Sequence, residues 1–314
     1  MKRTISPLSN LALAGVSLLA LLSACRTTAS PEPVSPGALV SAAELGPLLA
    51  RLGDDAVVLD VRERSAYDAG HLTGAVWLSL AEWEALSLAN DTGLSHEAAW
   101  RERIGSVGID GDDFVFVYDG GKLTQAARIW FVLQHFGAAS ASVVDGGWPA
   151  LVRGLESQTA PGATLAITTA PSTRPAVRFE PNASASIGLV ERGALRLAIK
   201  RGDVQVLDAR TTEEYRGLDL RSNSRGGHLP GAISLPHTRL IDEQGCLKSI
   251  DELQRLLAGA GFERGRPVIT HCDGGGRAAL AALAAQRAGF GPVLNYYLSF
   301  GDWSKDSTCP VVND

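Results

Sequence analysis

Short apolar runs alternate with longer amphipathic stretches along most of the chain. The apolar runs are rich in β-branched residues and end in polar residues or glycine; the clearest lie at 57–62, 114–118, 142–144, 204–210 and 267–270. Stretches with helical periodicity lie between or after them, at 81–88, 96–107, 124–136, 250–260 and 278–288. Short buried strands that alternate with helices are typical of the α/β class, in which helices flank a central parallel sheet. We therefore predict an α/β fold.

The second half of the chain repeats the order of the first. Three residues at and after the first strand of each half recur 148 positions later; the pairs are Asp60 with Asp208, Arg62 with Arg210 and Tyr67 with Tyr215. The sequence GHLTGA at 70–75 returns as GHLPGA at 227–232, 157 positions later. The second copy therefore has nine additional residues before its GHLPGA sequence, and these include Arg221 and Arg225. This repeat indicates a duplicated domain.

Length and composition agree with two domains joined by a linker. The chain has 314 residues, of which 45% are hydrophobic and 20% charged, so each half can bury a core. Residues 157–181 are rich in Pro, Thr and Ala and are predicted to link a first domain at 37–156 to a second at 182–314. The net charge is −5, and no basic stripe with interleaved aromatic residues occurs, so nucleic acid is not an expected partner.

The N-terminus has the pattern of a targeting segment. A basic start precedes an apolar run at 11–22, which is too short to cross a bilayer comfortably but suits the apolar region of a signal peptide. The run ends in Leu22-Ser23-Ala24-Cys25, which resembles the cleavage box of bacterial lipoproteins. The alternative is an ordinary signal peptide with an incidental cysteine.

The lipoprotein interpretation implies a signal peptide at 1–24, a lipidated Cys25 and a flexible tether at 25–36. Several acyl chains on one residue give stable membrane anchoring, whereas one chain does not. Arg26 stands where an Asp often signals retention in the inner membrane. We therefore expect a location in the cell envelope, anchored to the periplasmic face of the outer membrane.

The stretch at 267–279 combines a strand, a cysteine, a glycine loop and the start of a helix. The strand leads into Cys272, and an alanine-rich helical stretch begins after a loop formed by Asp273, Gly274, Gly275, Gly276 and Arg277. Glycines allow backbone N–H groups to converge on one point, and the helix N-terminus adds positive potential there. A thiol at that point ionises more readily than a free thiol. The loop is therefore predicted to hold a reactive thiolate; the alternative is a buried cysteine beside a tight turn.

The first half has a different residue at the matching position. Asp119 follows its strand where Cys272 follows the strand of the second half. A carboxylate cannot perform thiolate chemistry, so the nucleophile is confined to the second half. The first half is predicted to pack against it and to line one wall of a cleft between the halves.

Together, these motifs resemble the tandem rhodaneses, the thiosulfate and 3-mercaptopyruvate sulfurtransferases. The resemblance covers almost everything after the N-terminal segment and rests on LDVRERSAYDAGHLTGAV, LDARTTEEYRG, GGHLPGAISLP, VVDGGWPAL and CDGGGRAA. It implies two tandem rhodanese-like domains, each a central parallel sheet flanked by helices, of which only the second is catalytic.

The resemblance also implies a reaction. A sulfane sulfur would pass from thiosulfate or 3-mercaptopyruvate to cyanide or a thiol through a persulfide on Cys272, with no metal or organic cofactor. Arg277 and Arg221 are the residues expected to bind the anionic donor. Membership implies that the partners are small sulfur compounds.

Three features depart from the family pattern. Asp273 follows the nucleophile directly, and an acid there should oppose thiolate formation and repel an anionic donor unless its side chain points away. Glu214 stands where family members carry an arginine next to the aromatic residue of the first turn. The sequence NYYLSFGDW replaces an Asp-Gly-Ser-Trp type motif. These departures leave open which donor is preferred, and they predict slow turnover.

Two other functions remain open. His271-Cys272 and Arg277 resemble the loop of a cysteine phosphatase, but only four residues separate Cys272 from Arg277, where such phosphatases have five. The shorter loop favours a sulfur atom over a tetrahedral phosphate. The second alternative is a catalytically weak or inactive rhodanese-fold binding module of the cell envelope.

Three histidines that lie in these motifs are interpreted as structural. His71 and His228 occupy the same turn in both halves and are expected to build that turn. Neighbouring side chains on a strand point to opposite sides, so His271 is expected to be packed away from Cys272. A disulfide between Cys246 and Cys309 is one possibility.

Overall fold

The computed structural model of the protein describes residues 37–89, 93–156 and 165–313, and these form one compact unit. The predicted signal peptide, the tether and Cys25 lie outside the described residues. Within the described part of the chain, no helix is long and apolar enough to cross a membrane.

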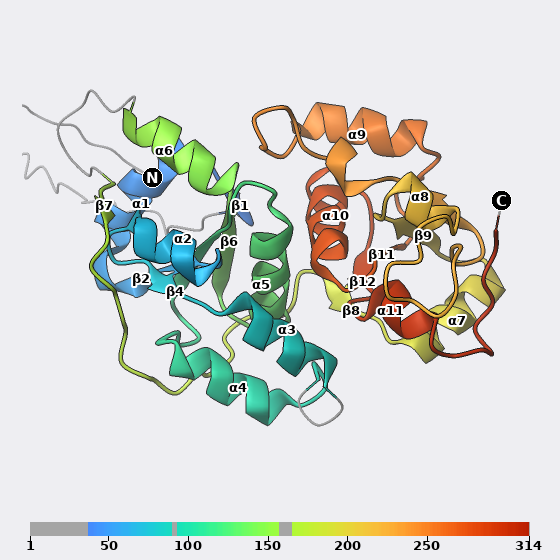
Figure 1. The fold of residues 1–314 in the computed structure, drawn as a ribbon, viewed down its shortest axis with the longest axis horizontal. Coiled ribbons are helices and arrows are strands. Elements are labelled where there is room, and N and C mark those ends of the chain that lie inside the picture. The colour runs from blue at the N-terminus through green and yellow to red at the C-terminus, as the bar shows by residue number, and fades with distance from the viewer. Residues whose placement is uncertain (1–36, 90–92, 157–164, 314) are drawn as a thin grey trace, which may run out of the picture. The chain divides into compact units, whose positions relative to one another are not determined.

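The first half is built on a five-stranded parallel sheet in the order β4-β2-β5-β6-β1 (Figure 1). Its strands are β1 (Leu39–Val40), β2 (Ala56–Asp60), β4 (Val76–Trp77), β5 (Phe114–Tyr118) and β6 (Ser140–Val144). Its helices are α1 (Ala42–Leu52), the 3-10 turn η1 (Gly53–Asp55), α2 (Arg64–Ala69), α3 (Leu80–Leu88), α4 (Glu97–Ser106), α5 (Thr124–His135) and α6 (Gly147–Glu156).

The second half repeats this architecture, with a parallel sheet in the matching order β10-β9-β11-β12-β8. Its strands are β8 (Gly188–Leu189), β9 (Gln205–Asp208), β10 (Ala232–Ser234), β11 (Val268–His271) and β12 (Val293–Asn295). Its helices are α7 (Arg192–Arg201), α8 (Thr212–Tyr215), the 3-10 turn η2 (His237–Arg239), α9 (Ile250–Gly259), α10 (Gly276–Arg287) and α11 (Ser299–Trp303). The predicted α/β class, with two domains built on parallel sheets, is confirmed.

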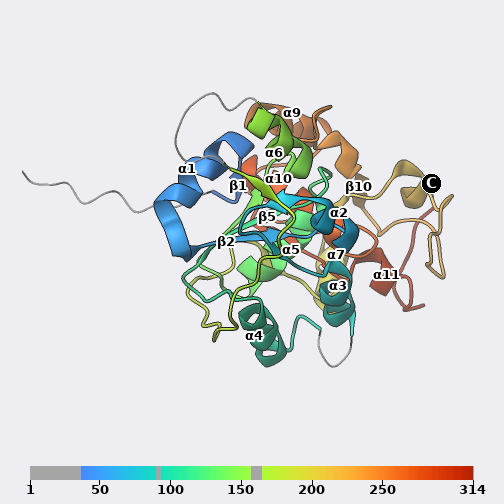
Figure 2. The same ribbon diagram turned by 60° about the vertical axis from the view of Figure 1, so that its left-hand side comes forward.

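Both faces of each sheet are covered, which explains why the strands read as continuous apolar runs. In the first half, Val58 and Phe116 face the core formed with α1 and α6, whereas Val57 and Val115 face the core formed with α3, α4 and α5. Figure 2 shows α1 and α6 on one side of the sheet and α4 on the other. The second sheet is likewise covered by α7 and α11 on one face and by α9 and α10 on the other.

Helices α5 and α10 pack against each other, one from each half (Figure 1). Most residues of both helices are buried, including the run from Ala278 to Ala285. Small alanine side chains let α10 lie close both to its own sheet and to α5. The alanine-rich sequence therefore serves packing as well as helix propensity, and the apolar core continues from one half into the other.

Two predicted strands are shorter than their apolar runs, for the same reason. The strand predicted at 57–62 ends at Asp60, and the one predicted at 204–210 ends at Asp208. Two residues later the backbone N–H of Arg62 or Arg210 donates to the aspartate side chain, at 2.9 and 3.0 Å. That side-chain bond turns the chain out of the strand.

The described part of the linker, 165–181, follows the surface of the first half. Strand β7 (Ile167–Thr168) pairs antiparallel with β3 (His71–Leu72). Phe179 is buried in the core shared by the two halves. These contacts fix the described linker residues to the first domain.

Candidate active site

The predicted glycine loop joins β11 to α10 and surrounds the sulfur of Cys272. The Cys272 side chain is only 1% exposed, and its Sγ accepts a hydrogen bond from the backbone N–H of Gly275 at 3.0 Å. Gly275 has φ of +101°, and a Cβ there would lie 2.9 Å from the carbonyl oxygen of Tyr297. A glycine is thus required for the turn that aims this N–H at the sulfur.

Ser299 holds the other side of the cysteine, and the sequence did not single it out. The Cys272 N–H donates to Ser299 Oγ at 3.0 Å, and the hydroxyl lies 3.7 Å from Sγ. The N–H groups of Phe300 and Gly301, in the first turn of α11, donate to the carbonyls of Cys272 and Asp273. The divergent sequence NYYLSFGDW therefore holds the backbone of Cys272 and Asp273 through these hydrogen bonds.

The first half shows what such a loop does with an anion. The buried carboxylate of Asp119 accepts four backbone N–H bonds, at 2.8 to 3.2 Å, from Gly121, Leu123, Gln125 and Ala126. These amides come from the loop and the first turn of α5, which matches α10. The converging N–H groups thus stabilise a negative charge at the position that corresponds to the Cys272 side chain.

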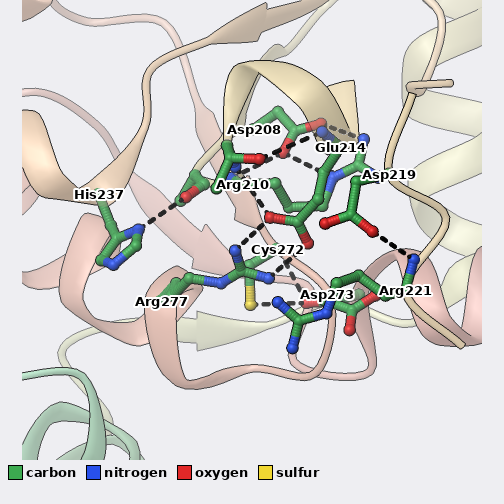
Figure 3. A network of polar contacts seen from close by, with 12 residues as sticks. Asp208, Arg210, Glu214, Asp219, Arg221, His237, Cys272, Asp273 and Arg277 are labelled. Carbon is green, nitrogen blue, oxygen red and sulfur yellow. Dashed lines mark hydrogen bonds and ion pairs between the residues drawn. The ribbon is translucent and has the colours of Figure 1, made fainter. Parts of the chain in front are cut away.

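Arg277 and Glu214 form a bidentate ion pair beside Cys272 (Figure 3). The two distances between guanidinium nitrogens and carboxylate oxygens are 2.5 and 2.9 Å. Burial by itself would raise the pKa of Glu214, but hydrogen bonds from Arg277 and from the Thr211 backbone lower it to about 2. Both groups are therefore charged at neutral pH, and Arg277 is already occupied by a carboxylate.

The Asp273 side chain is bound to the additional loop of the second half. Its Oδ1 accepts a hydrogen bond from Asn223 Nδ2 at 2.6 Å. Asp273 and Gly274 line a cavity of about 530 Å³, together with Glu84 of the first half and Asp302. The acid beside Cys272 thus faces this cavity and the additional loop of the second half.

Arg221 lies in that additional loop and is exposed. Its φ is +53°, an uncommon value for a residue with a Cβ, and its N–H donates to the Asp219 side chain at 2.9 Å. In the view of Figure 3 its side chain extends toward the Cys272 loop. The structure therefore brings Arg221 to the same region as Arg277, but only the Arg277 guanidinium is held by a carboxylate.

Arg225, the other arginine of the additional loop, donates to main-chain carbonyls, including those of Ser304 and Cys309, and fixes the C-terminal segment to this loop.

Arg128 and Glu84 reach the Cys272 loop from the first half, and the sequence did not single them out. The Arg128 side chain on α5 is 11% exposed and pairs with Glu84 at 3.1 Å. Its Nη1 donates to the hydroxyl of Tyr297 at 3.3 Å. No local sequence signal marks these residues, because they approach the Cys272 loop only when α5 packs against α10.

The histidines of the repeated turn pack in the same way in both halves. His71 and His228 stack on Tyr67 and Tyr215, with ring centroids 3.6 and 3.7 Å apart. These contacts agree with their interpretation as turn-building residues. Burial lowers the pKa of His271 to about 4, so this fully buried ring is neutral at neutral pH.

The three described cysteines are all free thiols. The possible disulfide between Cys246 and Cys309 is not formed: Cys246 lies against Gly146 of the first half, whereas Cys309 is buried in the core beside Trp303. Among the described residues, no group of three or more His, Cys, Asp or Glu side chains is placed to hold a metal ion.

Comparison with known proteins identifies the family. The model of the rhodanese-like domain matches residues 44–153 and again 191–306, one match in each half. The chain therefore belongs to the rhodanese-like family, in its tandem form.

Its relatives include named sulfurtransferases. The chain is 31% identical to a putative thiosulfate sulfurtransferase of Mycobacterium tuberculosis over 283 residues, which cover 87% of this chain and 96% of that protein. It is 30% identical to the 3-mercaptopyruvate sulfurtransferase of Escherichia coli over 254 residues, 78% of this chain and 84% of the other. The sequence thus places the chain among the sulfurtransferase-like members of the family.

Solved structures share the fold. The 3-mercaptopyruvate enzyme SseA of Escherichia coli superimposes with a TM-score of 0.65 at 26% identity, covering 84% of this chain and 99% of that chain. The anaerobic ergothioneine biosynthesis enzyme of Chlorobium limicola gives a TM-score of 0.74 at 19% identity, covering 88% and 70%. The second likeness concerns the fold alone.

Proposed function

We propose that the protein is a sulfurtransferase that carries a sulfane sulfur as a persulfide on Cys272. The observation that supports this most directly is the correspondence between the two loops. The first loop stabilises the Asp119 carboxylate with four N–H groups, and the second presents Cys272 at the same place, at the N-terminus of α10. A persulfide anion on Cys272 would meet the same kind of environment.

The reaction proceeds by double displacement. The Cys272 thiolate attacks the sulfane sulfur of thiosulfate, the S–S bond of the donor breaks, and sulfite leaves with the electron pair. With 3-mercaptopyruvate the C–S bond breaks instead, and pyruvate leaves after protonation. Cyanide or a thiolate then attacks the terminal sulfur, and the Sγ–S bond breaks to restore the Cys272 thiolate.

Several groups of this chain serve those steps. The Gly275 N–H donates to Sγ at 3.0 Å and stabilises negative charge there. The Ser299 hydroxyl donates to the Tyr296 carbonyl at 2.9 Å and accepts from the Cys272 N–H, so it holds the cysteine backbone in place. Arg221 supplies a positive charge for an anionic donor. Arg277 is held by Glu214, so it contributes less to donor binding than a free arginine would. The proposed enzyme is therefore slower with dianionic thiosulfate than a site with two free arginines.

A steady-state assay tests this proposal. Thiocyanate should form from thiosulfate and cyanide, or sulfide from 3-mercaptopyruvate and a thiol, and Cys272→Ser should abolish both. The same two proteins should also be given p-nitrophenyl phosphate, because hydrolysis that depends on Cys272 would support a phosphatase instead. Absence of transfer with every donor would favour the binding-module alternative, which the pairing of Arg277 with Glu214 also supports.

We further propose that the protein is anchored in the cell envelope through a lipidated Cys25. The support is the sequence alone: an apolar run that ends in Leu22-Ser23-Ala24-Cys25, followed by Arg26. Anchoring on the periplasmic face of the outer membrane would place the Cys272 site outside the cytoplasm.

A further inference from the structure

Two charged side chains of the first half touch opposite ends of the Cys272 loop. A Cβ on Gly276, the first residue of α10, would lie 3.3 Å from Nε and Nη2 of Arg128. A Cβ on Gly274 would lie 3.8 Å from Oε1 of Glu84. Because Arg128 and Glu84 are paired at 3.1 Å, their ion pair spans the loop that holds the sulfur.

The position of Arg128 is unfavourable unless a negative charge lies nearby. Its guanidinium is nearly buried, and it abuts the N-terminus of a helix, where the backbone dipole is already positive. Glu84 and the Tyr297 hydroxyl compensate part of this cost. Burial alone would lower the pKa of Arg128, yet that pKa is raised by Tyr297, by Glu84 and by the charge on Cys272. A negative charge on Cys272 is thus one of the groups that favour the charged form of Arg128.

We propose that Arg128, from the half without a nucleophile, is a positioning residue that stabilises the Cys272 thiolate, and that Glu84 moderates its effect. This inference rests on the proposed function, since the thiolate is the form that attacks the donor. It gives the first domain an electrostatic role in the chemistry in addition to packing. Separation of α5 from α10 would withdraw the positive charge from the loop.

Other charged and titratable groups also face this loop, and the experiment must hold them constant. From the second half these are Arg277, Glu214, Asp273, Arg221 and Tyr297. His271 is buried and neutral at neutral pH. Arg128 and Glu84 are the charges that the first half adds at Gly276 and Gly274.

The test measures the pH dependence of Cys272 alkylation by iodoacetamide in the full chain. Arg128→Gln removes a positive charge and should raise the midpoint by about one pH unit, which slows alkylation near pH 7 up to about tenfold. Glu84→Gln removes a negative charge and should lower the midpoint by a smaller amount. The double variant should lie near the wild type, and Arg128→Lys should retain most of the wild-type midpoint.

Arg103 and Glu82 provide a matched control, because they form a solvent-exposed pair between α4 and α3 at 3.4 Å. Arg103→Gln and Glu82→Gln should leave the midpoint unchanged. If the Arg128 and Glu84 variants shift it in the same direction, or neither shifts it, the proposal is wrong. Should Arg128→Gln fail to fold, Arg128→Lys and Glu84→Gln still decide the question. A midpoint near that of the wild type for Arg128→Lys and a lowered midpoint for Glu84→Gln support the proposal. A raised or unchanged midpoint for Glu84→Gln contradicts it. Alkylation needs no sulfur donor, so loss of the proposed function and loss of this inference can be told apart.

Discussion

At the scale of single residues, the ion pair between Glu214 and Arg277 is the feature by which this site departs from the pattern expected of the family. Glu214 is 1% exposed, and its carboxylate takes both guanidinium nitrogens that would otherwise bind an anion. In the proposed reaction, a dianionic donor therefore competes for Arg277 with the carboxylate of Glu214. The sequence showed that Glu214 stands where an arginine was expected. It did not show that the Glu214 carboxylate would bind the guanidinium of Arg277.

Glu214→Gln should increase the use of thiosulfate. Loss of one negative charge near the sulfur frees part of Arg277, and the kcat/KM for thiosulfate should rise about five- to tenfold at low ionic strength. The glutamine keeps an oxygen that can accept the Thr211 N–H, so α8 should keep its cap. Glu213→Gln, one residue earlier and exposed, should change nothing. An unchanged or lower value for Glu214→Gln would contradict this role.

The same pair should appear in the pH dependence of stability. The folded pKa of Glu214, about 2, lies below the usual 4.5, so the ionised pair stabilises the fold above about pH 4.5. That contribution is lost as the pH falls from 4.5 toward 2. Urea unfolding should show that wild type is more stable than Glu214→Gln at pH 6 and that the difference shrinks by pH 3. A constant difference over this range would contradict the ion pair.

At the scale of elements, the junction of β11 and α10 determines the site. Its sequence already predicted a strand, a turn of glycines and a helix, because all three signals are local. Ser299, Arg128 and Glu84 could not be predicted in this way, since they reach the loop from α11, α5 and α3. Helices α1 and α7 were not predicted either, although the capping box of α1, formed by Ser41 and Glu44, can be read from the sequence.

The glycines of this junction should differ sharply in their tolerance of a side chain. Gly275→Ala places a Cβ 2.9 Å from the Tyr297 carbonyl oxygen at a φ of +101°, and should destabilise the protein by about 2 kcal/mol. Gly274→Ala meets only Glu84 Oε1 at 3.8 Å, so its unfolding free energy should stay within about 0.5 kcal/mol of wild type. Thermal or urea unfolding measures both. Equal effects would mean that the loop conformation differs from the one described.

At the scale of the whole molecule, duplication divides the work between two similar domains. The order of the repeat in the sequence was enough to predict both sheets, and the presence of Asp119 at the position of Cys272 was enough to show which half lacks the cysteine. The contact between α5 and α10 was not predictable, because each helix reads as an ordinary amphipathic or alanine-rich segment. The described linker residues, which pair through β7 with the first domain, were predicted only as a connection.

Membrane anchoring is a separate prediction about the whole chain. Expressed in a Gram-negative bacterium, the wild type should incorporate labelled fatty acid and fractionate with the outer membrane. Cys25→Ser should lose the label and should not be processed at that position. Processing without incorporation of the label would indicate an ordinary signal peptide instead.

Intact-protein mass spectrometry after incubation with thiosulfate or 3-mercaptopyruvate tests the central claim most directly. The protein should gain one sulfur atom, about 32 Da, on Cys272, and cyanide should remove it, as expected for a persulfide. Cys272→Ser should gain nothing, whereas Cys246→Ser and Cys309→Ser should behave like wild type. A wild-type protein that gains no sulfur from any donor, or gains it equally in Cys272→Ser, would contradict sulfur transfer through Cys272.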